Sequence, residues 1–250
     1  MADIDIPALK EILWHKMHGD LKSLVPWFTS HEQILCPVCF RPLRYDDFSL
    51  EHIIPRQAVA DDPEEVRAAI PRNERSGMTL LCRKPLLINQ KIMYNNGCNS
   101  WKGKYFDPLL KDVFKPGLWT RPFTSQHHVA LFCAGYLGLV RKFGYQIALM
   151  PSGLLMRNQF FNPQKFVKEF PISSQVVFTG DATVEYSEDT RDFWSDPFRF
   201  SVGEGVAVTI LRNLVLPIPI SRDPTSPLAR VLPYAPSRFK LRPDLRTAFD

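Results

Sequence analysis

The sequence contains no apolar run near the roughly 20 residues that a membrane-spanning helix needs. Its N-terminal segment also lacks the basic start and apolar block of a secretory signal peptide. No internal repeat is visible. We therefore expect a cytoplasmic protein that has no membrane partner.

Cysteine is scarce, with five in 250 residues. Persistent disulfides are rare in the cytoplasm, so grouped cysteines there more often bind metal than pair with each other. Four of the five fall within one stretch, at Cys36, Cys39, Cys82 and Cys98. The fifth, Cys133, lies in an apolar helical segment and is expected to be a small core residue.

Composition indicates a folded chain, with 45% hydrophobic and 12% aromatic residues, long enough for one large domain or two small ones. The net charge of +5 is unevenly placed, because residues 83–121 hold eight Lys or Arg against two Asp. Such a segment suggests a polyanionic partner such as nucleic acid. Taken alone, it would be an ordinary solvated basic face.

Hydrophobic periodicity predicts helices at residues 8–28, 61–69, 99–114 and 127–143, the third interrupted by Pro108 and the last capped by Gly144. Strands are predicted at residues 48–55, 77–81, 175–179, 182–186, 198–202 and 206–220. The segment 114–125 is a candidate boundary, and the proline-rich tail 217–243 is expected to be extended.

The cysteines predict a structural zinc site. Cys36 and Cys39 form a Cys-x-x-Cys pair, which is a usual half of a four-thiolate site. Cys82 and Cys98 are separated by fifteen residues instead of two, so an insertion loop would have to bring them together. The alternative is that Cys82 is a buried strand residue and that the fourth ligand lies elsewhere. Zinc at such a site contributes on the order of 10 kcal/mol to folding.

Two further motifs accompany the cysteines, Glu-His-Ile-Ile-Pro at residues 51–55 and Cys-Asn-x-x-Lys-Gly at residues 98–103. In this order, over about residues 31–115, the sequence resembles the HNH endonuclease family with a four-cysteine zinc knuckle around a ββα-metal fold. The resemblance implies an α+β protein. An N-terminal helical segment (1–30) would precede the zinc-stabilised nuclease module (31–120), and a helix-plus-antiparallel-β domain (121–250) would follow.

The resemblance also implies roles for single residues. His52 matches the general base that deprotonates a water, and neutral imidazole suits this task because its pKa is about 6.5. Glu51 and Asn99 match the positions that hold one catalytic Mg²⁺ or Mn²⁺ through oxygen. Asn99 has a second interpretation as the N-cap of a helix.

Basic residues of the same module would hold the nucleic-acid backbone, namely Lys102, Lys104 and Arg56. Each lysine has the alternative of being an ordinary solvated side chain.

Two features depart from the family's pattern or geometry. The family often has an Asn just before the second strand, where this chain has Gly77, and Asn73 is nearby but out of register. Adjacent strand residues also point to opposite faces, so Glu51 and His52 cannot both face one ion on a regular strand.

The implied function is metal-dependent hydrolysis of phosphodiester bonds, with DNA as the expected substrate by family analogy. One alternative is an RNA-directed nuclease, and another is a catalytically inactive, zinc-stabilised module that binds nucleic acid. The C-terminal half would then provide specificity, regulation, or a surface for a homodimer or another protein. Nucleases of this family commonly occur in phage-defence systems and mobile elements, so the resemblance suggests one of these settings.

Overall fold

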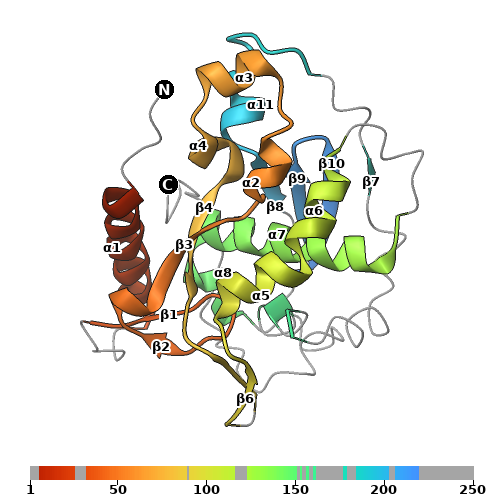
Figure 1. The fold of residues 1–250 in the computed structure, drawn as a ribbon. Helices are drawn as coiled ribbons and strands as arrows, with labels where there is room; N and C mark the ends of the chain where they lie inside the picture. Colours follow the sequence, from red (N-terminus) through yellow and green to blue (C-terminus); the bar gives the residue numbers. More distant parts are fainter. Residues whose placement is uncertain are drawn as a thin grey trace.

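The structure is a computed structural model of the 250-residue chain. It describes residues 6–25, 32–88, 90–115, 123–150, 153, 156–157, 160–161, 177–178, 184–202 and 206–219. Helices are mixed with small antiparallel sheets, so the fold class is α+β, as predicted (Figure 1).

The chain begins with helix α1 (Ile6–Leu24), which buries Leu13, Met17 and Leu21 on one face. Residues 26–28 of the predicted helix lie outside the described residues. Two short strands follow, β1 (Ile34–Leu35) and β2 (Pro42–Leu43), which pair antiparallel and frame the first two cysteines.

Strands β3 (Phe48–His52) and β4 (Met78–Cys82) form the antiparallel pair that carries most of the predicted site. Phe48 lies opposite Cys82, and His52 lies opposite Met78. All five residues of β4 are buried. The strand predicted at residues 48–55 extends too far, because β3 ends at His52 and residues 53–55 lead into a helix.

Three short helices connect β3 to β4, and each begins after a proline. They are α2 (Arg56–Val59), α3 (Glu64–Ala69) and α4 (Arg72–Ser76), with Pro55, Pro63 and Pro71 as their respective N-caps. Proline suits these positions because it fixes φ and needs no hydrogen-bond acceptor for an N–H. Only α3 was predicted.

After β4 the chain forms a hairpin, β5 (Leu86–Ile88) and β6 (Lys91–Tyr94), before helices α5 (Cys98–Tyr105) and α6 (Asp107–Val113). The predicted interruption of the 99–114 helix by Pro108 is confirmed. The helix breaks at Phe106, and the proline lies in the first turn of α6.

Helix α7 (Ser125–Phe143) runs through the centre of the molecule, and the short α8 (Tyr145–Leu149) follows it (Figure 1). Fifteen of the nineteen residues of α7 are buried. Glycines let it approach the C-terminal sheet closely. A Cβ at Gly138 would lie 2.5 Å from the Phe198 ring, and one at Gly135 would lie 2.7 Å from Ile218.

The C-terminal sheet has the order β7-β10-β9-β8 and is antiparallel throughout. Its strands are β7 (Val177–Phe178), β8 (Phe198–Val202), β9 (Val206–Leu211) and β10 (Leu214–Pro219), and helix α11 (Arg191–Ser195) precedes β8.

Two strand predictions in this half need correction. The segment 206–220 is two strands joined at Arg212 and Asn213. The predicted strand at 182–186 is wrong for residues 184–186, which pair with no strand, and residues 182–183 lie outside the described part of the chain. Residues 175–176, 179, 220–243 and the centre of the candidate boundary also lie outside it.

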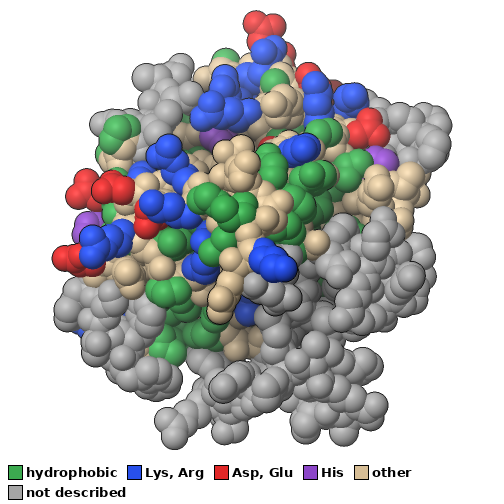
Figure 2. Space-filling model, turned by 60° about the horizontal axis from the view of Figure 1, so that its bottom comes forward, with side chains coloured by type: hydrophobic (Ala, Val, Ile, Leu, Met, Phe, Trp, Pro, Cys, Tyr) green, Lys and Arg blue, Asp and Glu red, His purple; other side chains and the backbone are tan. Residues whose placement is uncertain are grey.

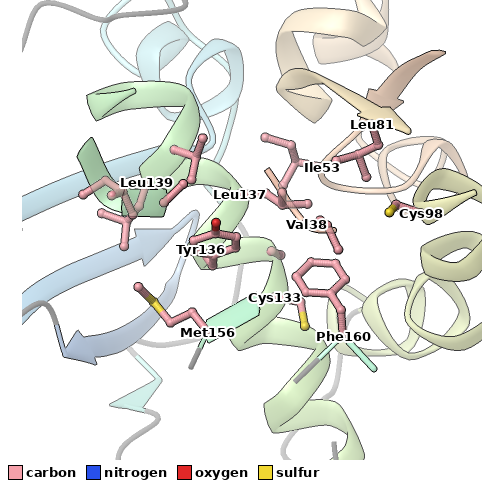
Figure 3. Packing of buried hydrophobic residues seen from close by; sticks show 14 of the residues in the cluster. Val38, Ile53, Leu81, Cys98, Cys133, Tyr136, Leu137, Leu139, Met156 and Phe160 are labelled. Carbon is pink, nitrogen blue, oxygen red and sulfur yellow. The ribbon is translucent and has the colours of Figure 1, made fainter. Parts of the chain in front are cut away.

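Buried side chains on both sides of the predicted boundary at residue 120 belong to one hydrophobic cluster that extends from Leu13 to Ile218. Figure 3 shows Val38, Ile53 and Leu81 beside the α7 residues Cys133 and Leu137. The two halves therefore share a core.

Tyrosines of the C-terminal half also hold the cysteine-bearing segment. The Tyr136 hydroxyl donates to the carbonyl of Pro37 at 2.7 Å, and the Tyr145 hydroxyl donates to the carbonyl of Leu35. Within the described part of the chain, no helix has both the length and the apolarity to cross a bilayer.

Candidate functional site

Three cysteine thiols meet where the β1–β2 hairpin approaches the start of α5. Cys36 follows β1, Cys39 lies in the intervening turn, and Cys98 is the first residue of α5. Their Sγ atoms all lie within 4.8 Å of one another, and those of Cys36 and Cys98 are 3.8 Å apart. Thiolates so arranged are the ligands that zinc prefers, so the cluster could hold a metal ion such as zinc.

Cys82, the last residue of β4, adjoins this cluster. Hydrogen bonds with neighbouring thiols lower the pKa of Cys39. The bond with Cys36 has the largest effect, and the bond with Cys82 the next largest. The Cys82 sulfur also accepts an N–H from Arg41 at 3.1 Å. These contacts place Cys82 beside the three thiols, and its role as the fourth ligand remains a prediction.

The long gap between Cys82 and Cys98 is closed by the β5–β6 hairpin, which pairs Leu86 with Tyr94 and returns the chain to its starting point. The return is tight at Gly97. A Cβ there would lie 2.0 Å from the Cys82 carbonyl oxygen and 2.5 Å from Arg83 Cα. Glycine is therefore the residue that lets α5 begin against the end of β4.

Cys133 is separate from these thiols. It is fully buried within α7, among the apolar side chains of the core. Burial raises the pKa of its thiol well above the ordinary value. It is a core residue, as the sequence indicated.

The predicted acidic residue, Glu51, points toward α5 and contacts a buried lysine. Lys102 Nζ lies 2.6 Å from Glu51 Oε1, 2.6 Å from Asp107 Oδ1 and 2.9 Å from the carbonyl oxygen of His52. Burial raises the pKa of Glu51 to about 7, against the opposing charge of Lys102. Burial also lowers the pKa of Lys102, but the two carboxylates outweigh that effect and the net shift is upward.

This geometry does not fit the predicted contact of Lys102 with a nucleic-acid backbone. The side chain is 0% exposed, and its ammonium group donates to three protein oxygens. Lys104, two residues on, is exposed, with its Nζ 5.1 Å from the centre of the Tyr105 ring and 5.7 Å from that of Tyr94. Arg56 is also exposed.

His52 points away from Glu51, toward α4 and α2, as strand alternation requires. Its Nε2 lies 3.1 Å from Asn73 Oδ1, and Arg56 Nε lies 3.3 Å from both its Nδ1 and its Nε2. An amide oxygen only accepts, so the Asn73 contact places the imidazole proton on Nε2 and leaves the lone pair on Nδ1. Burial lowers the pKa of His52 to about 4, and the charge of Arg56 acts in the same direction. The imidazole is neutral at pH 7.

Asn99 joins α5 to β3. Its Nδ2 donates to Ser49 Oγ at 2.8 Å and to the Leu50 carbonyl oxygen at 3.0 Å. The interpretation of Asn99 as an N-cap is wrong, because Gly97 is the N-cap of α5 and Asn99 lies inside the helix. Asn99 and Lys102 are one helical turn apart, and they meet Ser49 and Glu51, which are two residues apart on β3.

The chain was compared with protein-family models, with curated proteins and with solved structures. None of them matches it. The chemistry available at the site therefore follows from its own atoms.

Two residues that complete the site had weak signals in the sequence or none. Asn73, which lies out of register in the sequence, is buried on α4, and its side chain reaches His52 across the β3–β4 pair. Asp107 is the first acidic residue after an acid-free segment, residues 83–106, and it completes the pairing of Lys102. Neither contact follows from spacing along the chain.

The arrangement combines a neutral imidazole with a hydrogen-bond donor that has no acceptor among the described residues. Asn73 Nδ2 is buried without a hydrogen-bond partner among the described residues, beside an imidazole whose tautomer is fixed. The Arg56 guanidinium lies against the same ring, 3.3 Å from each of its nitrogens. Buried donors without partners are rare, and this one could bind an anionic oxygen or a water.

Proposed function

We propose that the chain is an HNH-type endonuclease that hydrolyses phosphodiester bonds of DNA in the cytoplasm. The observation that carries the proposal is the state of His52. It is buried and neutral at pH 7, its Nε2 contacts Asn73, which leaves the lone pair on Nδ1, and the Arg56 guanidinium lies 3.3 Å from both ring nitrogens. A general base for water needs such a lone pair, and a phosphate substrate needs a nearby cation.

In the proposed reaction a phosphate attracts the Arg56 guanidinium, which leaves the Nδ1 atom of His52 free. A water then attacks phosphorus in line with the leaving oxygen, and Nδ1 takes its proton. The new bond joins the water oxygen to phosphorus, the bond from phosphorus to the 3′ oxygen breaks, and that oxygen takes a proton from solvent while Nδ1 later returns its own proton to solvent. The products carry a 5′-phosphate and a 3′-hydroxyl group. Asn73 holds the ring throughout and offers its free Nδ2 as a donor.

A catalytic divalent ion fits the oxygen atoms that remain. Asn99 uses its nitrogen for Ser49 and Leu50, and Glu51 uses Oε1 for Lys102, so neither Asn99 Oδ1 nor Glu51 Oε2 has a partner among the described residues. Magnesium and manganese accept such a small set of protein oxygens together with water and phosphate. When bound, the ion would neutralise charge on a phosphate. Glu51 and His52 point to opposite sides of β3, so the ion and the base would act on one phosphate only across the end of the strand, where His52 lies.

The thiols would hold a structural zinc ion, with Cys82 as the fourth ligand beside Cys36, Cys39 and Cys98. Their chemistry fits, since four thiolates form the closed tetrahedron of structural zinc sites. The ligands come from the β1–β2 turn, the end of β4 and the start of α5. Zinc would therefore fix the helix that carries Asn99 and Lys102 against β4, the partner of the strand that carries His52.

One observation favours a second candidate, a zinc-stabilised module that binds nucleic acid and does not cut it. The Lys102 ammonium already contacts Glu51 and Asp107, so two carboxylates share a cation that belongs to the chain. A protein without a catalytic ion would retain this pairing unchanged.

Plasmid cleavage separates the two candidates. Supercoiled plasmid is incubated with the protein and Mg²⁺ or Mn²⁺, in parallel with His52→Ala and with the control His15→Ala, whose side chain is 72% exposed on α1. We expect the wild type and His15→Ala to nick or cut the plasmid and His52→Ala to leave it intact while still shifting it on a gel. If the wild type binds the plasmid without cutting it, the second candidate is correct, and if it does neither, both are wrong.

A further inference from the structure

The β5–β6 hairpin is the part of the module that the proposed hydrolytic site does not use. It occupies the segment between Cys82 and Cys98 and projects from the body of the molecule, at the end of β4 remote from α2, α3 and α4 (Figure 1). Among the described residues of the hairpin and its flanks, only Leu86, Gly97 and the two cysteines are buried.

The hairpin exposes an apolar pair. Leu87 and Ile92 lie opposite each other on the two strands, and their exposed fractions are 45% and 62%. A single exposed apolar side chain, such as Ile12, is ordinary, but two of them side by side on a projecting element form a surface suited to contact with another molecule.

The charge around the hairpin identifies the kind of molecule. Residues 83–106 contain five Lys or Arg and no Asp or Glu. Lys102 is buried and Lys84 pairs with Asp47 at 3.0 Å, which leaves Arg83, Lys91 and Lys104 exposed. Figure 2 shows Lys and Arg across the lower face, with apolar side chains between them and acidic ones mainly toward its edges. Such a surface suits a polyanion that also offers apolar contacts.

The dimensions suit a duplex. A two-stranded ribbon fits the major groove, where apolar side chains can contact thymine methyl groups. Gln90, at the tip of the hairpin, is twelve positions along the chain from Met78, the partner of His52. At about 3.3 Å per residue these positions span at most about 40 Å. One turn of B-DNA is about 34 Å.

We propose that the β5–β6 hairpin inserts into the major groove of duplex DNA, within about one helical turn of the phosphate at His52. Leu87 and Ile92 contact base edges, and Lys91 contacts the backbone. This assignment deepens the proposed function, on which it rests for the position of the cut.

Binding is measured apart from cleavage, in a His52→Ala background, by fluorescence anisotropy with a labelled duplex. The hairpin variant is Leu87→Ser with Ile92→Ser, and the control is Ile12→Ser, an equally apolar side chain that is 49% exposed on α1. We expect the hairpin variant to raise the Kd at least fivefold and the control to leave it unchanged. Methyl green, which occupies the major groove, should displace the protein, whereas the minor-groove ligand distamycin should not. Circular dichroism and zinc content confirm that each variant folds.

Equal affinity of the hairpin variant and its parent would overturn the assignment, as would competition by distamycin alone or an absence of duplex binding. The outcome is separate from that of the plasmid experiment. If the protein binds through the hairpin but the wild type does not cleave the plasmid, the hairpin assignment is supported and the nuclease proposal is wrong. If the wild type cleaves the plasmid but the hairpin variant binds as tightly as its parent, the nuclease proposal is supported and the hairpin assignment is wrong.

Discussion

At the scale of single residues, Lys102 has the most unusual environment in the site. Its ammonium is fully buried between the carboxylates of Glu51 and Asp107 and also donates to the backbone of β3. A buried charge is tolerated only when it is paired and hydrogen-bonded, and Lys102 meets both conditions. The lysine thereby ties α5 to the strand that carries His52.

Replacing Lys102 by Met should destabilise the protein by about 3–5 kcal/mol, because the buried carboxylate of Glu51 and the partly exposed carboxylate of Asp107 would lose the cation between them. Urea unfolding at pH 7.5 measures the effect. The control is Lys104→Met, two residues along the same helix but exposed, which should change stability by less than about 0.5 kcal/mol. Adding Glu51→Gln to Lys102→Met should restore part of the loss. If Lys102→Met and its control behave alike, the buried pairing is wrong.

The His52 imidazole predicts a dependence of stability on pH. Its pKa is about 4 in the folded protein, against the ordinary value of 6.5 for the unfolded chain. As the pH falls from 6.5 to 4, the unfolded state gains a proton that the folded state does not, so stability decreases. Two and a half pH units correspond to roughly 3 kcal/mol, and above pH 6.5 the effect is absent.

The measurement compares the wild type with His52→Gln, which cannot titrate, by urea unfolding between pH 4 and 8. The difference in free energy of unfolding between the two proteins should be constant above pH 7 and should move by roughly 3 kcal/mol against the wild type toward pH 4. His15→Gln supplies the control, because the His15 side chain is 72% exposed. A difference that does not vary with pH would contradict the buried, neutral imidazole.

The sequence indicates which residues could form a site better than it indicates what surrounds each of them. Facing directions along β3 were predictable, since side chains alternate on any strand, and Glu51 and His52 do contact different partners. The burial of Lys102 was not predictable, because the helical pattern places Lys102 and Lys104 without saying which one meets β3. Asn73 depends on how three proline-started helices fold back over the strand pair, which no spacing encodes.

At the scale of elements, the approach of α5 to β4 depends on Gly97. Its backbone angles are those of an extended residue, so any amino acid could adopt them, and the restriction is one of space. The Cys82 carbonyl and Arg83 occupy the position that a Cβ would take.

Gly97→Ala should therefore move the start of α5 away from β4, lower the stability by about 1–3 kcal/mol and reduce zinc retention. Gly103→Ala, on the exposed side of the same helix, is the matched control. Its nearest neighbour outside the helix backbone would be Asp107 Oδ2 at 3.8 Å, and it should stabilise the protein by about 0.5–1 kcal/mol. Zinc content and urea unfolding are the readouts. Equal zinc retention by the two variants would show that the contact is not needed.

Elements with a strong pattern were predictable and those that depend on distant partners were not. The break at Pro108 and the helix ending at Gly144 follow from local chemistry. Residues 184–186 look like a strand, yet Val184 and Tyr186 pack against Trp194 of α11 and the helices nearby, and the segment pairs with no strand among the described residues. Strand propensity depends on such partners more than helix propensity does.

At the scale of the whole molecule, the two halves of the chain are held together by more than a shared core. Asp62, in the connection before α3, is bound by Arg75 of the same region at 2.5 Å and by Arg212 of the β9–β10 turn at 2.6 and 2.9 Å. All three side chains are buried. The network links the helices around His52 to the C-terminal sheet.

A fragment of residues 1–115 should therefore fail to fold by itself, even with zinc. It would lack α7, which fills the centre of the core, and the tyrosines that hold Leu35 and Pro37. We expect the full chain to unfold in one cooperative transition and the fragment to show none by circular dichroism. A cooperative, zinc-dependent transition in the fragment would establish an independent N-terminal domain.

A division at residue 120 was a reasonable prediction, because proline, glycine and aromatic residues at 114–125 are typical of a linker. Composition does not show that Tyr136, Leu137 and Gly138 fit against elements on both sides of that segment. Long-range packing of this kind is decided by shape, which a single sequence does not display.

The bond between Asp62 and Arg212 also has a consequence for the order in which a newly made chain folds. The two residues are 150 positions apart. At synthesis rates of about 5–20 residues per second, roughly 8–30 s pass between their appearances. During that interval the ribosome has released β3, β4 and α5 without the last strands of the sheet. We expect any capacity to cut nucleic acid to be withheld until Arg212 has been synthesised, which would spare the ribosome-bound messenger and nearby DNA from an incomplete chain.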